Sequence, residues 1–374
     1  MIHPQTLTDR QRIRESFQSL VHFDAESGSE AAIAAYLREK LCALGLMVTQ
    51  DAAGNLFAVL KATRAGESVL FCAHMDTVSP GRGKRAILYP DGIFHSDGTT
   101  VLGADDAAGL SAILEALMVI RDKKLAHPRI EVLFTVKEEL YCHGSAAFDF
   151  GVVTARDAYV LDLTGKIGTV AVAAPSILSL DILVYGRAAH AGFEPEAGIN
   201  ALTAAARALA ALDTGRVEAD TTVNFGTISG GSGKNVVPAE VRIHGEIRSM
   251  RHERALAAAE TIRARFEAEA RKLGGKAELT VTEEIHAYRV KEDAPVLRRL
   301  HRALERLGCG EAKLVDTFGG SDNNRFHSAG VCGVVLACAM ENVHTTAETC
   351  DLDELQKSAE LTLMLMTMEE TAQV

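Results

Sequence analysis

Two kinds of apolar pattern alternate along the first half of the chain. Residues 29–45 ("SEAAIAAYLREKLCALG") have apolar side chains at helical spacing and end at a glycine. Residues 68–78 ("SVLFCAHMDTV") are rich in β-branched and aromatic side chains and predict a central strand. An amphipathic helix is predicted over 105–124, and further strands over 55–62, 129–139 and 158–165. This alternation predicts an α/β sheet that is parallel at least in part.

From about residue 177 the order of the predicted elements changes. The segments read strand, helix, strand, strand, helix, strand, and they are 176–186, 199–212, 221–231, 239–249, 253–274 and 276–285. That order is typical of a ferredoxin-like α+β domain. A helix over 294–308 and a strand over 331–340 then restore the first pattern. We therefore predict one catalytic domain (1–176 and 289–374) interrupted by a smaller domain (177–288).

Composition narrows the classes of function. The net charge of −11 and the pI of about 5.7 argue against nucleic-acid binding, which needs clustered Lys and Arg. No apolar stretch is long enough to span a bilayer, and the N-terminal residues lack the apolar core of a secretory signal. Seven scattered cysteines, never in C-x-x-C spacing, fit reduced thiols. We expect a cytoplasmic protein with no membrane partner.

Histidine and acidic side chains recur where predicted strands end. The positions are His74 and Asp76, Asp105, Glu138 and Glu139, Asp162, and His344. In open α/β sheets, ligands collect at the carboxyl ends of the strands. Each residue alone has an ordinary explanation as a turn, a cap or a solvated face. Five such ends at one edge of a sheet predict a functional site.

Imidazoles with carboxylates and no thiolates suit zinc or a similar divalent ion in a hydrolytic site. Two ions about 3.5–4 Å apart need a shared carboxylate and further ligands on each side. The inventory of predicted ligands is His74, Asp105, Glu139, Asp162 and His344, with Asp105 as the bridge. Glu138 then remains as a general base that takes a proton from metal-bound water. Asp76 is predicted to accept the second ring N–H of His74 and so to fix its tautomer.

Several motifs, in order along nearly the whole chain, resemble one family. They are "HMDTV", "DGTTVLGADDAAGL", "KEE", "LDLTG", "AAHAGFEPEAGINA", "NVVPAEVRIHGEIR" and "GGSDNNRF". The chain resembles the di-zinc exopeptidases that include peptidase T, acetylornithine deacetylase and carboxypeptidase G. The resemblance implies a mixed-sheet catalytic domain with a lid that commonly serves in dimerisation. It also implies two divalent ions per chain, zinc with manganese or cobalt as alternatives. One ion would be held by His74, Asp105 and Asp162, and the other by Asp105, Glu139 and His344.

The same resemblance implies further residues that contact substrate. His190 matches the lid histidine that polarises the scissile carbonyl, in its own site or that of a partner subunit. Asn235, Arg248, Ser321 and Asp322 fall where the family contacts the backbone of the substrate. Arg248 suits a carboxylate because its guanidinium offers paired donors.

The leading interpretation is a metal-dependent aminopeptidase acting on short peptides, with tripeptides as the expected substrate. A second interpretation keeps the same site for an N-acyl amino acid deacylase or a carboxypeptidase. A third, a non-catalytic binding protein, is disfavoured because every expected ligand and Glu138 are present. The expected partners are a small peptide and a second copy of the chain.

Overall fold

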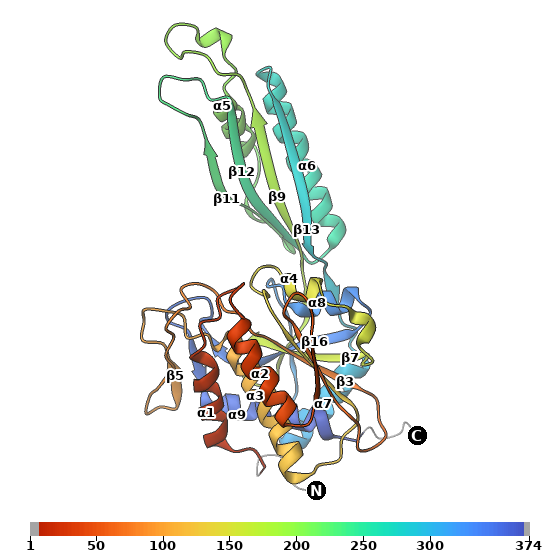
Figure 1. Ribbon diagram of the computed structural model, residues 1–374. Coiled ribbons are helices and arrows are strands. Elements are labelled where there is room, and N and C mark those ends of the chain that lie inside the picture. Colours follow the sequence, from red (N-terminus) through yellow and green to blue (C-terminus); the bar gives the residue numbers. More distant parts are fainter. Residues whose placement is uncertain (1–6, 370–374) are drawn as a thin grey trace. The chain divides into compact units, whose positions relative to one another are not determined.

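A computed structural model describes residues 7–369, and they form two units (Figure 1). Unit 2 consists of Ala174–Tyr288 together with Phe318–Gly320, and unit 1 contains the remainder. The domain boundaries predicted from the sequence place 318–320 in the larger domain. These residues join unit 2 because the Phe318 carbonyl accepts a hydrogen bond from Arg248 at 3.0 Å and Gly320 packs against Ile285.

Unit 1 is built on one mixed sheet, which has 12 strands among the described residues. Its main path runs β1-β2-β6-β3-β7-β16-β17-β5-β4, and β8, β14 and β15 pair beside it. The strands are β1 (Met47–Gln50), β2 (Leu56–Leu60), β3 (Val69–His74), β4 (Ile87–Leu88), β5 (Ile93–His95), β6 (Ile130–Thr135), β7 (Asp157–Thr164), β8 (Thr169–Ala174), β14 (Tyr288–Arg289), β15 (Lys313–Asp316), β16 (Cys332–Glu341) and β17 (Thr349–Asp351). The mixed α/β class predicted from the sequence is confirmed.

The helices of unit 1 cover both faces of this sheet (Figure 1). The long helix α3 packs against α1 and α9 and lies over β3, β7 and β16. Helix α8 packs on β7 and β16, where its Phe326 joins a cluster with Phe148 and Phe150. The helices are α1 (Arg10–Val21), α2 (Ala31–Ala43), α3 (Ala104–Lys123), α4 (His143–Ala146), α7 (Pro295–Leu307), α8 (Asp322–Ser328) and α9 (Leu352–Thr367), with a 3-10 turn at Phe150–Val152. Covering both faces explains why β3 is buried along its whole length.

Four adjacent strands of this sheet position the candidate site. β3 lies between β6 and β7 and is parallel to both, and β7 is parallel to β16. The carboxyl ends of β6, β3, β7 and β16 therefore open at the same edge.

Unit 2 is an antiparallel sheet with two helices on one face. Five strands pair in the order β10-β11-β12-β9-β13 within the described residues. The elements are β9 (Ser176–Tyr185), a 3-10 turn (Pro195–Ala197), α5 (Ala201–Ala210), β10 (Gly215–Glu218), β11 (Thr221–Gly230), β12 (Glu240–Ser249), α6 (His252–Lys272) and β13 (Lys276–Ile285). Alternate side chains of β9, from Leu178 to Val184, enter the core beneath α5 and α6. The predicted ferredoxin-like order is observed, with the short β10 added at one edge.

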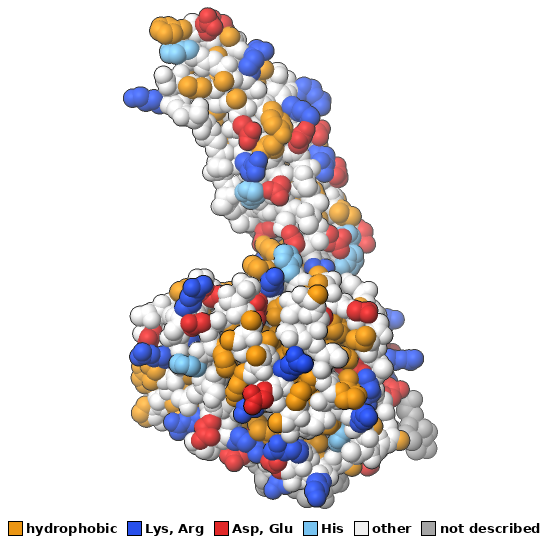
Figure 2. All heavy atoms as spheres, in the orientation of Figure 1, with side chains coloured by type: hydrophobic (Ala, Val, Ile, Leu, Met, Phe, Trp, Pro, Cys, Tyr) orange, Lys and Arg blue, Asp and Glu red, His pale blue; other side chains and the backbone are white. Residues whose placement is uncertain are grey.

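The surface carries side chains of both charges, and the described helices are not long and apolar enough for a membrane. On the face drawn in Figure 2, acidic and basic side chains are interspersed over both units. Within residues 7–369, none of the helices is both long enough and apolar enough to cross a lipid bilayer.

Candidate active site

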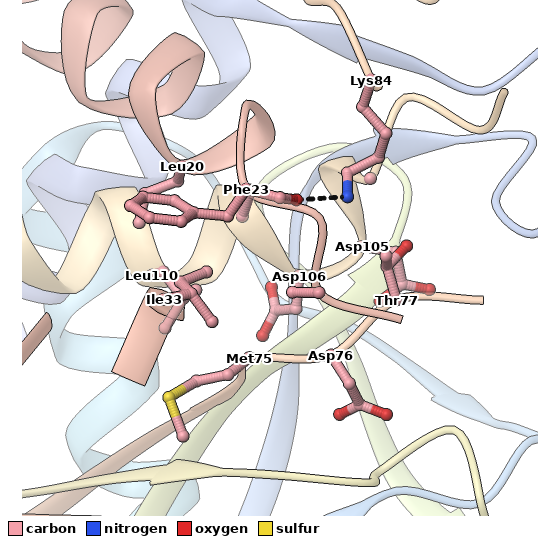
Figure 3. Close-up of a pocket in the computed structure, with 13 residues that line it drawn as sticks. Leu20, Phe23, Ile33, Met75, Asp76, Thr77, Lys84, Asp105, Asp106 and Leu110 are labelled. Atoms are coloured by element: carbon pink, nitrogen blue, oxygen red, sulfur yellow. Dashed lines mark hydrogen bonds between the residues drawn. The ribbon is translucent and has the colours of Figure 1, made fainter. Parts of the chain in front are cut away.

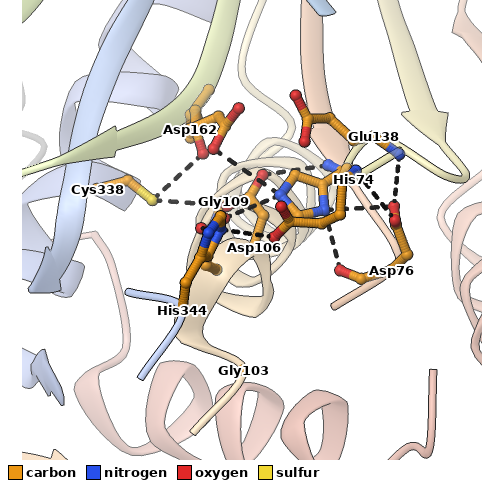
Figure 4. Close-up of polar contacts among 12 residues, drawn as sticks. His74, Asp76, Gly103, Asp106, Gly109, Glu138, Asp162, Cys338 and His344 are labelled. Atoms are coloured by element: carbon orange, nitrogen blue, oxygen red, sulfur yellow. Dashed lines mark hydrogen bonds and ion pairs between the residues drawn. The ribbon is translucent and has the colours of Figure 1, made fainter. Parts of the chain in front are cut away.

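The strand ends of unit 1 bring the predicted ligands together. His74 is the last residue of β3, Asp162 lies in β7, and Asp105 lies at the start of α3. Glu139 follows β6, and His344 follows β16. Figure 4 shows His74, Asp162 and His344 turned toward a common centre.

The carboxylate of Asp105 contacts both histidines, one through each oxygen. His74 Nε2 lies 2.9 Å from Asp105 Oδ1 and 3.8 Å from Asp162 Oδ1. His344 Nε2 lies 3.2 Å from Asp105 Oδ2 and 2.9 Å from Glu139 Oε1. The contacts thus separate into a His74–Asp162 side and a His344–Glu139 side that share Asp105.

The donor set fits divalent metal ions. Ligand atoms of His74, Asp105 and Glu139 all lie within 4.8 Å of one another. Glu139 Oε1 is buried, and the His344 ring, whose Nε2 is 2.9 Å away, is its nearest charge-balancing group. Burying several carboxylates together is costly, and a divalent cation bound among them would offset that cost. Imidazole and carboxylate ligands suit zinc or a similar ion.

The ionisable groups of the site shift one another's pKa values. Hydrogen bonds to Asp105 and Glu139 raise the pKa of His344 to about 10. Burial raises the pKa of Asp162 well above its usual range, and the neighbouring Asp105 carboxylate raises it further. Burial acts in the same direction on Asp105, but hydrogen bonds from His344 and His74 outweigh it and lower the pKa of that carboxyl. The site therefore concentrates carboxylates that positive charge must balance.

Glu138 lies beside these residues and is almost fully buried. Burial raises its pKa well above the usual range, and the nearby carboxylates of Asp322 and Glu139 contribute in the same direction while His74 opposes them. The Cys142 thiol donates to Glu138 Oε1 at 3.3 Å. Glu138 also forms, with His74 and Asp162, a group of ligand atoms within 4.8 Å of one another. Its carboxylate thus borders the side of the site where His74 and Asp162 meet.

Asp76 has a broader role than the sequence predicted. Strand β3 ends at His74, and the ring atom Nδ1 lies 2.9 Å from the Asp76 main-chain carbonyl but 3.5 Å from its carboxylate. The carboxylate instead accepts the backbone N–H groups of Glu138 at 2.9 Å and Glu139 at 3.2 Å, and the Ser27 hydroxyl at 2.7 Å. Asp76 therefore orients His74 through its main chain and fixes the two glutamates through its side chain.

Two further carboxylates support the site and were not predicted from the sequence. Glu348 is buried and accepts the backbone N–H of Gly103 at 2.7 Å and of Asp105 at 3.0 Å. Asp106, also buried, accepts the N–H of His74 at 3.2 Å and of Gly109 at 2.9 Å. Both carboxylates hold the backbone of predicted ligands. The adjacent acidic pair at 105–106 could have indicated Asp106, whereas no local pattern indicates Glu348.

A buried lysine lines the same small cavity as Asp105 (Figure 3). Lys84 Nζ donates to the carbonyls of Phe23 at 2.7 Å and Gly81 at 2.9 Å, and burial lowers the pKa of its ammonium to about 8. Together with Asp76, Asp105 and Asp106, it lines a small cavity. Its aliphatic stem fills the space that a Cβ at Gly103 would occupy, at 2.7 Å from Lys84 Cε. A residue larger than glycine at 103 would displace this lysine.

Ser321 and Asp322, which the resemblance assigned to substrate contact, have roles inside unit 1. Ser321 caps α8 in a capping box with Asn324. Asp322 is 1% exposed, and its carboxylate accepts hydrogen bonds from Thr135 at 2.5 Å and from Ser145. Asp322 therefore joins α8 to the end of β6 and to α4, and in this structure its carboxylate is used within the protein.

His190 and Asn235 lie together in unit 2. The Ala191 N–H donates to the Asn235 carbonyl at 2.9 Å, and His190 forms a β-bridge with Val236. His190 Nδ1 accepts the N–H groups of Gly192 at 3.2 Å and Phe193 at 3.1 Å. These bonds assign the ring proton to Nε2, which leaves His190 as a donor to an external oxygen.

Arg248 is engaged within unit 2. Its guanidinium contacts the Glu246 carboxylate through Nε at 2.8 Å and Nη2 at 3.2 Å, and Nη1 donates to the Phe318 carbonyl. A substrate carboxylate would have to compete with Glu246 for this fork.

Comparisons with known proteins agree with this architecture. Residues 172–274 match the peptidase dimerisation domain of M20 peptidases, and residues 55–160 match peptidase family M28. Aminopeptidase PepT from Bacillus cereus is 37% identical, with a TM-score of 0.88, over 96% of this chain and 99% of that one. A tripeptidase from Staphylococcus aureus is 34% identical, with a TM-score of 0.92, over 96% of this chain and 98% of that one. YqjE of Bacillus subtilis is 36% identical over 96% of this chain and 99% of its own length. The chain therefore belongs to the M20 peptidase family, in the group that contains the PepT enzymes.

Proposed function

We propose that this protein is a metal-dependent aminopeptidase that hydrolyses short peptides, with tripeptides as its preferred substrates. The observation that carries the proposal is the Asp105 carboxylate, which contacts His74 and His344 through different oxygens. A carboxylate shared in this way is what a two-ion hydrolytic site requires. The similarity to a PepT and to a tripeptidase over nearly the whole chain supports the substrate class.

The proposed ligands fall into two sets, one for each ion. His74 and Asp162 would hold one ion, and His344 and Glu139 the other, with Asp105 shared. When bound, two divalent ions supply Lewis acidity toward water and toward the scissile carbonyl. Zinc suits the donors, and manganese or cobalt are the alternatives.

Glu138 is the proposed general base. It takes a proton from the attacking water and returns it to the leaving amine. Asp76 holds the Glu138 N–H at 2.9 Å, and the Cys142 thiol contacts the Glu138 carboxylate. These bonds restrict where the base can lie before substrate arrives.

Substrate polarity separates an aminopeptidase from the alternatives. In an aminopeptidase, acidic or carbonyl groups near the metal ligands would anchor the free α-ammonium group of the substrate. Acetylation removes that charge and would leave such an anchor without a partner. His190 Nε2 and Asn235 would serve the substrate's carbonyl and backbone groups, and Arg248 a substrate carboxylate, as the family resemblance implies.

The experiment compares trialanine with N-acetyl-trialanine under saturating zinc, manganese or cobalt. We expect kcat/KM for the free peptide to exceed that for the acetylated peptide by at least about tenfold, equivalent to about 1.4 kcal/mol. The Glu138→Gln variant serves as the control that the turnover belongs to this site. Equal or faster cleavage of the acetylated peptide would favour a deacylase or carboxypeptidase and overturn the aminopeptidase assignment.

We also propose a homodimer formed through unit 2. Residues 172–274 match a dimerisation domain. Strand β10 pairs only with the first residues of β11, from 221 to 223. Beyond them β11 pairs with β12 on one side, and no described strand of this chain pairs with its other side, where Ile228 is exposed. An open strand edge is a template for pairing with a second copy. Light scattering on the purified protein tests this, and a monomer at micromolar concentration would contradict it.

A further inference from the structure

A second cluster of ligand-type side chains lies in unit 2 and takes no part in the proposed peptidase site. It consists of His252, the first residue of α6, Glu283 in β13, and His286 just beyond β13. We infer that these three side chains bind a transition-metal ion, with zinc as the ion best suited to them. Two imidazoles and one carboxylate form a donor set that zinc commonly uses.

The carboxylate lies between the two rings. His286 Nδ1 is 2.8 Å from Glu283 Oε1, and His252 Nε2 is 3.6 Å from Glu283 Oε2. One ligand atom from each of the three residues lies within 4.8 Å of the others. Ligands about 2.0–2.2 Å from a zinc ion stand at separations within this range. Small side-chain rotations would therefore direct all three donors at one ion.

The His252 ring is oriented by a buried partner. Its Nδ1 lies 3.0 Å from the Ser176 hydroxyl, which also accepts the N–H of Ala287 at 2.8 Å. If Nδ1 carries the proton and donates it to Ser176, Nε2 presents a lone pair toward Glu283. An oxygen that accepts the other ring N–H in this way is typical of metal-binding histidines. The His252 side chain is only 18% exposed, so this orientation is also fixed by packing.

The two histidine rings lie close to each other. Their centroids are 4.2 Å apart with an interplanar angle of 32°. Two protonated rings at this distance would repel, whereas neutral rings sharing one ion would not. Glu283 and His286 are 46% and 47% exposed, which leaves room for water to complete the coordination. The positive end of α6 opposes a cation at His252, so we expect moderate affinity.

An ion here would link the start of α6 to the end of β13, and the contact between His252 and Ser176 connects both to β9. His252 begins α6, Glu283 and His286 lie at the end of β13, and Ser176 begins β9. These are the segments near which the chain enters and leaves the unit at residues 174 and 288. A ligand that binds only the folded state stabilises it. We therefore expect zinc at this site to stabilise unit 2 against local opening.

The test measures zinc by equilibrium dialysis of the full-length protein and compares the wild type with His286→Asn. We expect the wild type to retain one zinc per chain more than the variant at the same free zinc concentration. In Glu283→Gln, which keeps both histidines, the affinity of that ion should fall by at least about tenfold. Turnover of trialanine should be unchanged in both variants.

A matched control comes from another exposed histidine–carboxylate pair in unit 2. His244 Nδ1 lies 2.6 Å from Asp181, but this pair is not part of any three-residue ligand group among the described residues. His244→Asn should bind as much zinc as the wild type. Equal zinc content in the wild type and His286→Asn would overturn the proposal, as would an equal loss in His244→Asn. The comparison depends on a difference between variants, so it does not rest on how many ions the peptidase site holds.

Discussion

The two clusters of histidine and carboxylate use the same residue types in opposite surroundings. Around Asp105 in unit 1, His74, Asp105 and Glu138 are buried, whereas the His344 side chain is 51% exposed. The backbone N–H groups of these three buried residues donate to supporting carboxylates, namely Asp106, Glu348 and Asp76 respectively. Around Glu283 in unit 2, two of three side chains are nearly half exposed. The buried part of the first cluster is therefore fixed before any ligand arrives, whereas in the second cluster only His252 is, and Glu283 and His286 depend on the ligand to order them. Preorganisation of this kind is what catalysis requires and simple binding does not.

The largest expected effect comes from removing the shared carboxylate. Asp105→Ala should lose both ions and reduce peptidase activity to background, because Asp105 is the one carboxylate among residues 7–369 that contacts both histidines. His344→Ala should mainly weaken one ion. Metal analysis by mass spectrometry measures both, with the exposed Asp97→Ala as a control. Two ions retained in Asp105→Ala would show that it is not a bridge.

The second-largest effect is expected when the proposed general base, Glu138, is replaced. Glu138→Gln should lower kcat by about 10²- to 10⁴-fold with metal content nearly intact, because it removes the proton acceptor and keeps the shape. The adjacent Glu139→Gln is the matched variant and should weaken one ion. If Glu138→Gln loses an ion instead, the two glutamates exchange roles. Near-normal turnover in Glu138→Gln would exclude it as the base.

A smaller effect is expected when the support of the glutamates is weakened. Asp76→Asn replaces one acceptor oxygen by an amide that faces backbone N–H groups of Glu138 and Glu139. We expect kcat to fall by about 10- to 100-fold. Asp149→Asn, which perturbs an exposed carboxylate bonded to the Gly151 N–H, is the control. If both variants behave like the wild type, backbone support does not matter for turnover.

The smallest effect is expected in unit 2, at Arg248. Arg248→Lys removes the paired guanidinium donors that now bind the Glu246 carboxylate. Because this ion pair is partly exposed, the free energy of unfolding should change by no more than about 1 kcal/mol. If Arg248 also anchors a substrate carboxylate, KM for trialanine should rise by less than about tenfold while KM for its C-terminal amide stays the same. An equal change for both substrates would exclude that anchoring role.

The sequence predicted the site best where the chemistry is local to a strand end. His74, Asp162 and His344 each stand at the end of an apolar run, and parallel strands must bring such ends to one edge. The ferredoxin-like order of unit 2 followed from periodicity in the same way. These features depend on near neighbours along the chain, which a sequence displays directly.

Contacts between segments that are distant along the chain leave no local pattern in the sequence. Glu348 supports the Asp105 backbone across more than 240 positions, and its surroundings in the sequence give no sign of this. The carboxylate of Asp322 is used by Thr135, a partner that only the folded chain brings near. Asp76 was predicted to have one partner and has several, because β3 ends two residues earlier and its carboxylate lies near the backbone of 138–139 and the Ser27 hydroxyl.

The short segment Phe318–Gly320 has a practical consequence for dissecting the molecule. Phe318 lies against the Arg216 guanidinium at 4.3 Å, and a Cβ at Gly320 would lie 2.1 Å from Ile285 Cδ1. A recombinant fragment cut at residues 174 and 288 would lack this segment and expose the surface it covers. Such a fragment would be prone to aggregate, so expression of unit 2 alone calls for a linker that carries 318–320 back onto it.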